Sequence, residues 1–141
     1  MRIKIVTTSI AIAAVVFISV ACGRSGSSDV GKTVKSATVG DTTVTLSSAS
    51  GELKQGENNL TLSFTDPSGK AVDVPAASLK FHMPAMGSMA EMNDVATLTT
   101  TATRGKFQAV VNIESAGTWE AMISFQGPRG TEQATMTINV K

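Results

Sequence analysis

The chain has 141 residues, enough for one domain, and it is rich in threonine, serine, valine and alanine. Charged side chains make up 16% of it and nearly balance, with twelve basic and eleven acidic residues. This balance excludes the basic surface that a nucleic acid backbone requires. The high threonine and valine content favours sheets over helical bundles.

The first 21 residues have the features of a secretory signal peptide. Arg2 and Lys4 supply the positive start, residues 10–20 form an apolar run, and the small residue Ala21 follows. The run is shorter than the roughly 20 apolar residues that a transmembrane helix needs. We therefore expect residues 1–21 to be removed and the rest of the chain to lie outside the cytoplasm.

Cys22 is the only cysteine, and it stands directly after the apolar run. The stretch from Ser19 to Cys22 resembles the bacterial lipobox, although Ser19 stands where leucine is usual. The resemblance implies lipidation of Cys22, and Gly23 at the next position implies an outer-membrane lipoprotein facing the periplasm in a Gram-negative cell. The alternative is an ordinary signal peptide with an incidental cysteine.

Cleavage before Cys22 would leave ten basic and eleven acidic side chains, a formal balance of −1, and no cysteine in the folded part. That part can then form no disulfide and offers no thiolate to a metal. Methionine is the sulfur ligand that remains.

Residues 22–39 are predicted to be a flexible tether, because they are rich in glycine and serine and show no apolar periodicity. Over residues 40–141, apolar and polar residues alternate with a period of two. The predicted strands lie at about 44–46, 60–64, 72–74, 78–82, 95–99, 107–113, 119–126 and 136–140. This spacing predicts an all-β fold, an immunoglobulin-like antiparallel β-sandwich of seven to eight strands.

Four of the seven methionines recur at every third residue, directly after the only histidine, His82. Thioether sulfur is soft and uncharged, and together with imidazole it selects Cu(I) or Ag(I) over hard ions. Pro84 and Gly87 disfavour a continuous helix, so we expect a loop with at most one helical turn at 88–93. The predicted copper ligands are His82, Met83, Met86, Met89 and Met92.

Strand alternation leaves a second interpretation open for Met83. It shares a face with Leu79 and Phe81, which would make it a core residue, whereas His82 faces the other way. The smaller ligand set is then His82 with two or three of the other methionines. Glu91 and Asp94 lie nearby, and their carboxylates would suit Cu(II) better or would simply be solvated.

Trp119 has two interpretations as well. The largest apolar side chain of a predicted strand is most simply a core residue, but its ring would also cover a soft cation by cation–π attraction. Met122 lies on the polar face of the same strand and alone indicates no function.

Five motifs occur in order along the chain: Gly56-x-Asn58-x-Leu60, Asp66 to Val72, Met83-Pro84-Ala85-Met86-Gly87-Ser88-Met89, Gly105-x-Phe107 and Gly117-x-Trp119. Together they resemble the YtkA-like domain, to which the FixH proteins of cytochrome oxidase assembly are similar, over about residues 40–141. The resemblance implies an extracytoplasmic immunoglobulin-like sandwich, often lipid-anchored or fused to heavy-metal efflux adaptors. It also implies copper binding at Met83, Met86 and Met89. The transmembrane helix expected of FixH is missing from the sequence.

The sequence supports two kinds of function. One is a copper-binding lipoprotein that buffers Cu(I) or hands it to a copper exporter, an efflux adaptor or an oxidase. The other is a non-metal interaction or scaffolding module, whose methionine segment packs against a partner or seals the sandwich. We do not expect an enzyme, because the mature domain would hold one histidine, no cysteine and no spacing typical of a catalytic triad.

Overall fold

A computed structural model describes residues 31–141, so the predicted signal peptide, the lipidation of Cys22 and residues 22–30 of the predicted tether lie outside the described residues. None of the described residues belongs to a helix that could cross a membrane. The strands of this part of the chain are β1 (Lys32–Val39), β2 (Thr42–Ser48), β3 (Gly56–Thr65), β4 (Ala77–Met83), β5 (Met92–Val95), β6 (Thr97–Thr100), β7 (Lys106–Ile113), β8 (Gly117–Gly127) and β9 (Gly130–Val140).

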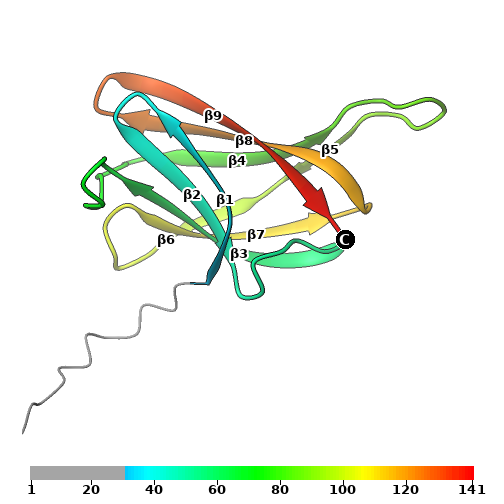
Figure 1. Cartoon of the computed structure of the whole chain (residues 1–141), viewed down its shortest axis with the longest axis horizontal. Coiled ribbons are helices and arrows are strands. Elements are labelled where there is room, and N and C mark those ends of the chain that lie inside the picture. Colours follow the sequence, from blue (N-terminus) through cyan, green and yellow to red (C-terminus); the bar gives the residue numbers. More distant parts are fainter. Residues whose placement is uncertain (1–30) are drawn as a thin grey trace, which may run out of the picture.

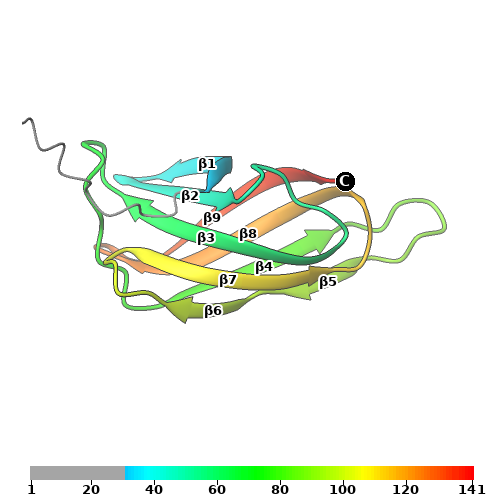
Figure 2. The ribbon, with the colours of Figure 1, turned by 90° about the horizontal axis from the view of Figure 1, so that it is seen from below.

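The strands form two antiparallel sheets that pack as a sandwich (Figures 1 and 2). One sheet has the order β1-β2-β3-β7-β6, and the other has the order β5-β4-β8-β9. If β1 and β5 are set aside, seven strands remain, and their order is that of the immunoglobulin fold. The first, second, fifth and fourth of the seven form one sheet, and the third, sixth and seventh form the other. The predicted fold class is confirmed, with nine strands in the described residues instead of seven or eight.

Strand β1 corrects the predicted domain boundary. Residues 32–39 pair with the whole length of β2. The last eight residues assigned to the tether are therefore part of the sheet. The strand is an edge strand, and only Val34, Ala37 and Val39 pack partly against the core. An edge strand with so few apolar residues has a weak alternating pattern, which is why the sequence suggested a linker.

Alternation along the long strands supplies the core between the sheets. Each of these strands directs every second side chain inward, and the largest of the fully buried ones are aromatic. Phe64 lies 5.9 Å from Phe107 and 4.9 Å from Phe125, measured between ring centroids. Phe64 comes from one sheet and Phe125 from the other, so these rings hold the two sheets together.

The single strand predicted at residues 95–99 is wrong. The chain changes sheet at Ala96, so Val95 ends β5 in one sheet and Thr97 begins β6 in the other. Ala96 is buried, and its N–H donates to the carbonyl oxygen of Leu79 at 3.0 Å. The alternating pattern runs on through the crossover and contains no glycine or proline to mark it.

Candidate metal-binding hairpin

Residues 83–92 form a β-hairpin, which we call the methionine hairpin. Its arms keep one register, from the Met83–Met92 pair to a bridge between Met86 and Met89. The N–H of Met86 donates to the carbonyl oxygen of Met89 at 3.1 Å, and the N–H of Met89 donates back at 2.9 Å. The helical turn allowed for at 88–93 is absent, since Met92 begins strand β5.

Gly87 and Ser88 close the hairpin as a two-residue turn. Gly87 has φ of 57°, and no non-glycine residue of the described chain has a positive φ. Glycine with a positive φ at the first central position is typical of a type II′ turn, whose twist matches that of the two arms. The Gly-Ser dipeptide was the signal in the sequence that could have predicted this hairpin.

The methionine hairpin extends beyond the end of the sandwich, and two perpendicular views agree on this (Figures 1 and 2). Pro84 follows β4 directly and has no N–H to donate, which contributes to the end of the regular ladder at Met83. From Met83 to Ala90 the hairpin carries no charged side chain. The result is a narrow projection whose tip is uncharged and whose one charged residue, Glu91, lies next to Met92 at its base.

Two pairs of methionines occupy this hairpin in opposite environments. Met83 is 3% exposed and belongs to the hydrophobic core, and its partner Met92 packs partly against that core. We call these two residues the inner pair. Met86 and Met89, the tip pair, are 58% and 48% exposed. The terminal methyl of Met83 packs against the β8 backbone at Gly117. A Cβ atom added at Gly117 would lie only 2.9 Å from this methyl.

The two pairs cannot share one metal ion. Three residues separate Met83 from Met86 along an extended arm, which corresponds to about 10 Å. An odd separation also assigns the two pairs to opposite faces of the hairpin. The core interpretation of Met83 is therefore the one the structure has, and the smaller ligand set without Met83 stays a prediction.

His82 is also separated from the tip pair. It lies on β4 between Asn93 of β5 and Glu120 of β8, four residues or about 13 Å of extended chain before Met86. Its Nδ1 is 2.9 Å from Oδ1 of Asn93. This hydrogen bond ties the ring to β5 and away from the tip. His82 is thus a surface residue of the sheet and does not complete a site at the tip.

Trp119 is fully buried, and its Nε1 donates to the carbonyl oxygen of Ser115 at 2.9 Å. Its indole is a buried core side chain, as the first of the two interpretations expected, and the cation–π role stays a prediction. Asp94 accepts a hydrogen bond from the N–H of Glu114 at 3.2 Å, and Glu91 is exposed. Across residues 31–141, no three histidine, cysteine, aspartate or glutamate side chains form a group that could hold a metal.

The tip pair does fit a soft ion by its chemistry. Met86 and Met89 are directly opposite each other, and such cross-strand neighbours have Cβ atoms about 5 Å apart on one face. Flexible thioethers from these positions can reach one ion between them, and soft sulfur selects Cu(I) or Ag(I). Of the predicted ligands, only these two are both adjacent and accessible.

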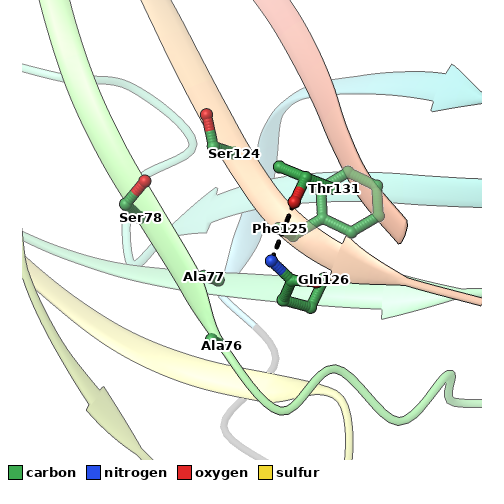
Figure 3. Close-up of a pocket in the computed structure, with 7 residues that line it drawn as sticks. All are labelled: Ala76, Ala77, Ser78, Ser124, Phe125, Gln126 and Thr131. Carbon is green, nitrogen blue, oxygen red and sulfur yellow. Dashed lines mark hydrogen bonds between the residues drawn. The ribbon is translucent and has the colours of Figure 1, made fainter.

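A shallow hollow at the other end of β4 offers less. It has a volume of about 220 Å³ and is lined by Ala76, Ala77, Ser78, Ser124, Phe125, Gln126 and Thr131 (Figure 3). The side-chain amide of Gln126 donates across it to the hydroxyl of Thr131 at 2.8 Å. None of these seven side chains is titratable or a preferred metal ligand, so the hollow is not a candidate centre.

Two carboxyl groups with shifted pKa values belong to other loops. The pKa of Asp66 is lowered by hydrogen bonds from the Ser68 hydroxyl and from the backbone N–H groups of Lys70 and Ser68. The pKa of Glu52 is lowered by its hydrogen bond and ion pair with Lys141. Both shifts favour the charged carboxylate, as expected for structural contacts.

An immunoglobulin-like sandwich, with nine strands in residues 31–141 and an exposed methionine hairpin, defines the class of this protein. The model of the YtkA-like family matches residues 36–124, which include the whole methionine hairpin, and the chain belongs to that family. No curated protein matches the sequence.

Proposed function

We propose that the chain is an extracytoplasmic, lipid-anchored domain that binds Cu(I) or Ag(I) through Met86 and Met89. The observation that carries the proposal is the exposure of two paired thioethers at the tip of a projecting hairpin. Large apolar side chains gain stability by burial, so two of them facing solvent at paired positions indicate a binding role.

The uncharged tip supports a monovalent soft ion over a hard divalent one. Hard ions are held by carboxylates, and none lies between Met83 and Ala90. Two thioethers on an open projection form a weak, accessible site, which suits transfer of the ion to another protein. A copper exporter, an efflux adaptor or an oxidase-assembly protein is the kind of recipient we propose.

The test is a titration of the purified protein with Ag(I), or with Cu(I) under anaerobic conditions, against a competing chelator. The Met86→Ala and Met89→Ala double variant is expected to lose affinity by about tenfold or more, equal to about 1.4 kcal/mol. Met122→Ala is the matched control, because Met122 is 39% exposed on β8 and lies outside the hairpin.

X-ray absorption of the Cu(I)-loaded protein gives a second, independent readout. We expect a sulfur shell that disappears in the double variant and persists in Met122→Ala. An oxygen or nitrogen shell alone, or equal affinities of all three proteins, would refute the thioether site.

The alternative is a docking role for the same hairpin without metal. It is favoured by the uncharged, projecting tip, which has the shape of an element that enters a groove of a partner. In that case metal would leave the melting temperature unchanged, and the double variant would lose a complex without any change in metal content.

A further inference from the structure

We propose that Met86 and Met89 are sites of reversible oxidation to methionine sulfoxide, and that this modification switches off soft-metal binding without unfolding the domain. The first part follows from exposure and packing. The second part rests on the proposed function, and the experiments below separate the two.

The six methionines of the described chain form a series of decreasing accessibility. Met86 and Met89 are the most exposed, Met122 is 39% exposed, Met92 is half-buried, and Met83 and Met136 are each 3% exposed. Oxidation of a thioether requires that the oxidant reach the sulfur, so its rate should follow this series.

The fold tolerates a sulfoxide at the tip. The turn is held by two backbone hydrogen bonds between Met86 and Met89 and by the conformation of Gly87, not by thioether packing. A sulfoxide at Met83 would instead place a polar oxygen on a core side chain, which costs free energy unless the oxygen is hydrogen-bonded. Modification is therefore structurally mild only where the sulfur is exposed.

The chemistry is a two-electron oxygen transfer from a peroxide. A sulfur lone pair attacks one oxygen of hydrogen peroxide, the S–O bond forms as the O–O bond breaks, and water leaves. Sulfur is oxidised and peroxide is reduced. Methionine sulfoxide reductases reverse the step with a dithiol, which becomes a disulfide as the sulfoxide oxygen leaves in water. The sulfoxide removes the soft thioether donor that Cu(I) and Ag(I) select.

The first experiment measures oxidation order by peptide mass spectrometry after limited treatment of the purified protein with hydrogen peroxide. Met86 and Met89 should be oxidised about tenfold faster than Met83 and Met136. Equal rates at all four positions would overturn the proposal.

The second experiment uses the Met122→Leu variant, in which Met86 and Met89 are the only methionines of residues 31–141 that are exposed. After oxidation at the tip, Ag(I) affinity should fall about tenfold or more, while the circular dichroism spectrum and melting temperature stay unchanged. Methionine sulfoxide reductases A and B with dithiothreitol should restore binding.

The outcomes distinguish the switch from the function on which it depends. If the untreated variant binds Ag(I) and the oxidised one binds it equally well, the switch is refuted and the metal site stands. If the untreated variant binds no Ag(I), both the metal site and the switch fall, whatever the oxidation order. Loss of the folded state on tip oxidation would also overturn the switch.

Discussion

The inner pair and the tip pair of methionines lie on the same two arms, three residues apart, yet their environments are opposite. Met83 is in the core, whereas Met86 and Met89 face solvent. The residue type is the same, so the difference comes from position in the register alone. A thioether near the body of the sandwich gains stability by burial, and a thioether beyond it is free to bind.

The largest expected effect is on stability, at the inner pair. Met83→Ala should lower the free energy of unfolding by about 2–5 kcal/mol, because it opens a cavity beside Gly117. Met86→Ala should change it by less than about 0.5 kcal/mol, as expected for an exposed position. Urea denaturation measures both, and similar losses would mean that the two pairs do not differ.

Met83→Leu provides the control for that comparison. It keeps the volume and removes the sulfur, so the stability loss should stay below about 1.5 kcal/mol. Affinity for Ag(I) should be that of the unmodified protein. A marked loss of affinity in this variant would make Met83 a ligand after all.

The next effect is on the geometry of the tip. Gly87→Ala should cost about 1–2 kcal/mol locally, because alanine disfavours a positive φ even though no atom lies near the new side chain. The hairpin would be less ordered, and Ag(I) affinity should fall about threefold to tenfold. Ser88→Ala is the matched control, since Ser88 has no positive φ, and isothermal titration would compare the two variants.

A small effect is expected at His82. His82→Ala removes the contact with Asn93, but it should leave Ag(I) affinity within about twofold, because His82 precedes Met86 by four residues, or about 13 Å of extended chain. Affinity of the unmodified protein should also be flat between about pH 5 and 8, since thioether sulfur is uncharged and binds no proton in this range. A site that weakens in acid would return His82 to the ligand set.

The smallest effect is on the pH dependence of folding stability. It is distinct from the pH dependence of Ag(I) affinity. The lowered pKa of Asp66 means that its carboxylate stabilises the folded state above the ordinary pKa of aspartate, and that this contribution is lost as the pH falls through the lowered value. Melting temperatures in acid should therefore fall less in Asp66→Asn than in the unmodified protein. Identical pH profiles would refute the contribution.

Alternation predicted much of the fold because the long strands are half-buried. Residues such as Phe81, Phe107 and Ile123 lie inside as their positions in the pattern require, and Met83 was placed correctly by the same rule. The alternating pattern gave wrong strand assignments in two places where it does not reflect burial between the sheets. Strand β1 is mostly polar at a sheet edge, and Ala96 continues the alternation while the chain changes sheets.

The candidate site was less predictable. The sequence predicted a loop at these methionines, and a loop does not fix the side on which each sulfur lies. In a hairpin, residues three apart in the sequence lie on opposite faces. Only Met86 and Met89 at the tip are both paired with each other and exposed to solvent. The distance between His82 and the tip depends on the length of the hairpin arms. The types of the predicted ligands do not reveal that length.

The equal arms of the hairpin have an evolutionary consequence. Shortening both arms by one residue, for example by loss of Ala85 and Ala90, would keep the Gly-Ser turn but rotate both tip sulfurs to the other side of the ribbon. A deletion or insertion of one residue in both arms would thus move the sulfurs to the other face without substituting any remaining residue. A deletion or insertion in one arm only would break the alignment of the two sulfurs. The face on which the tip sulfurs lie is therefore set by whether the number of residues in each arm is odd or even.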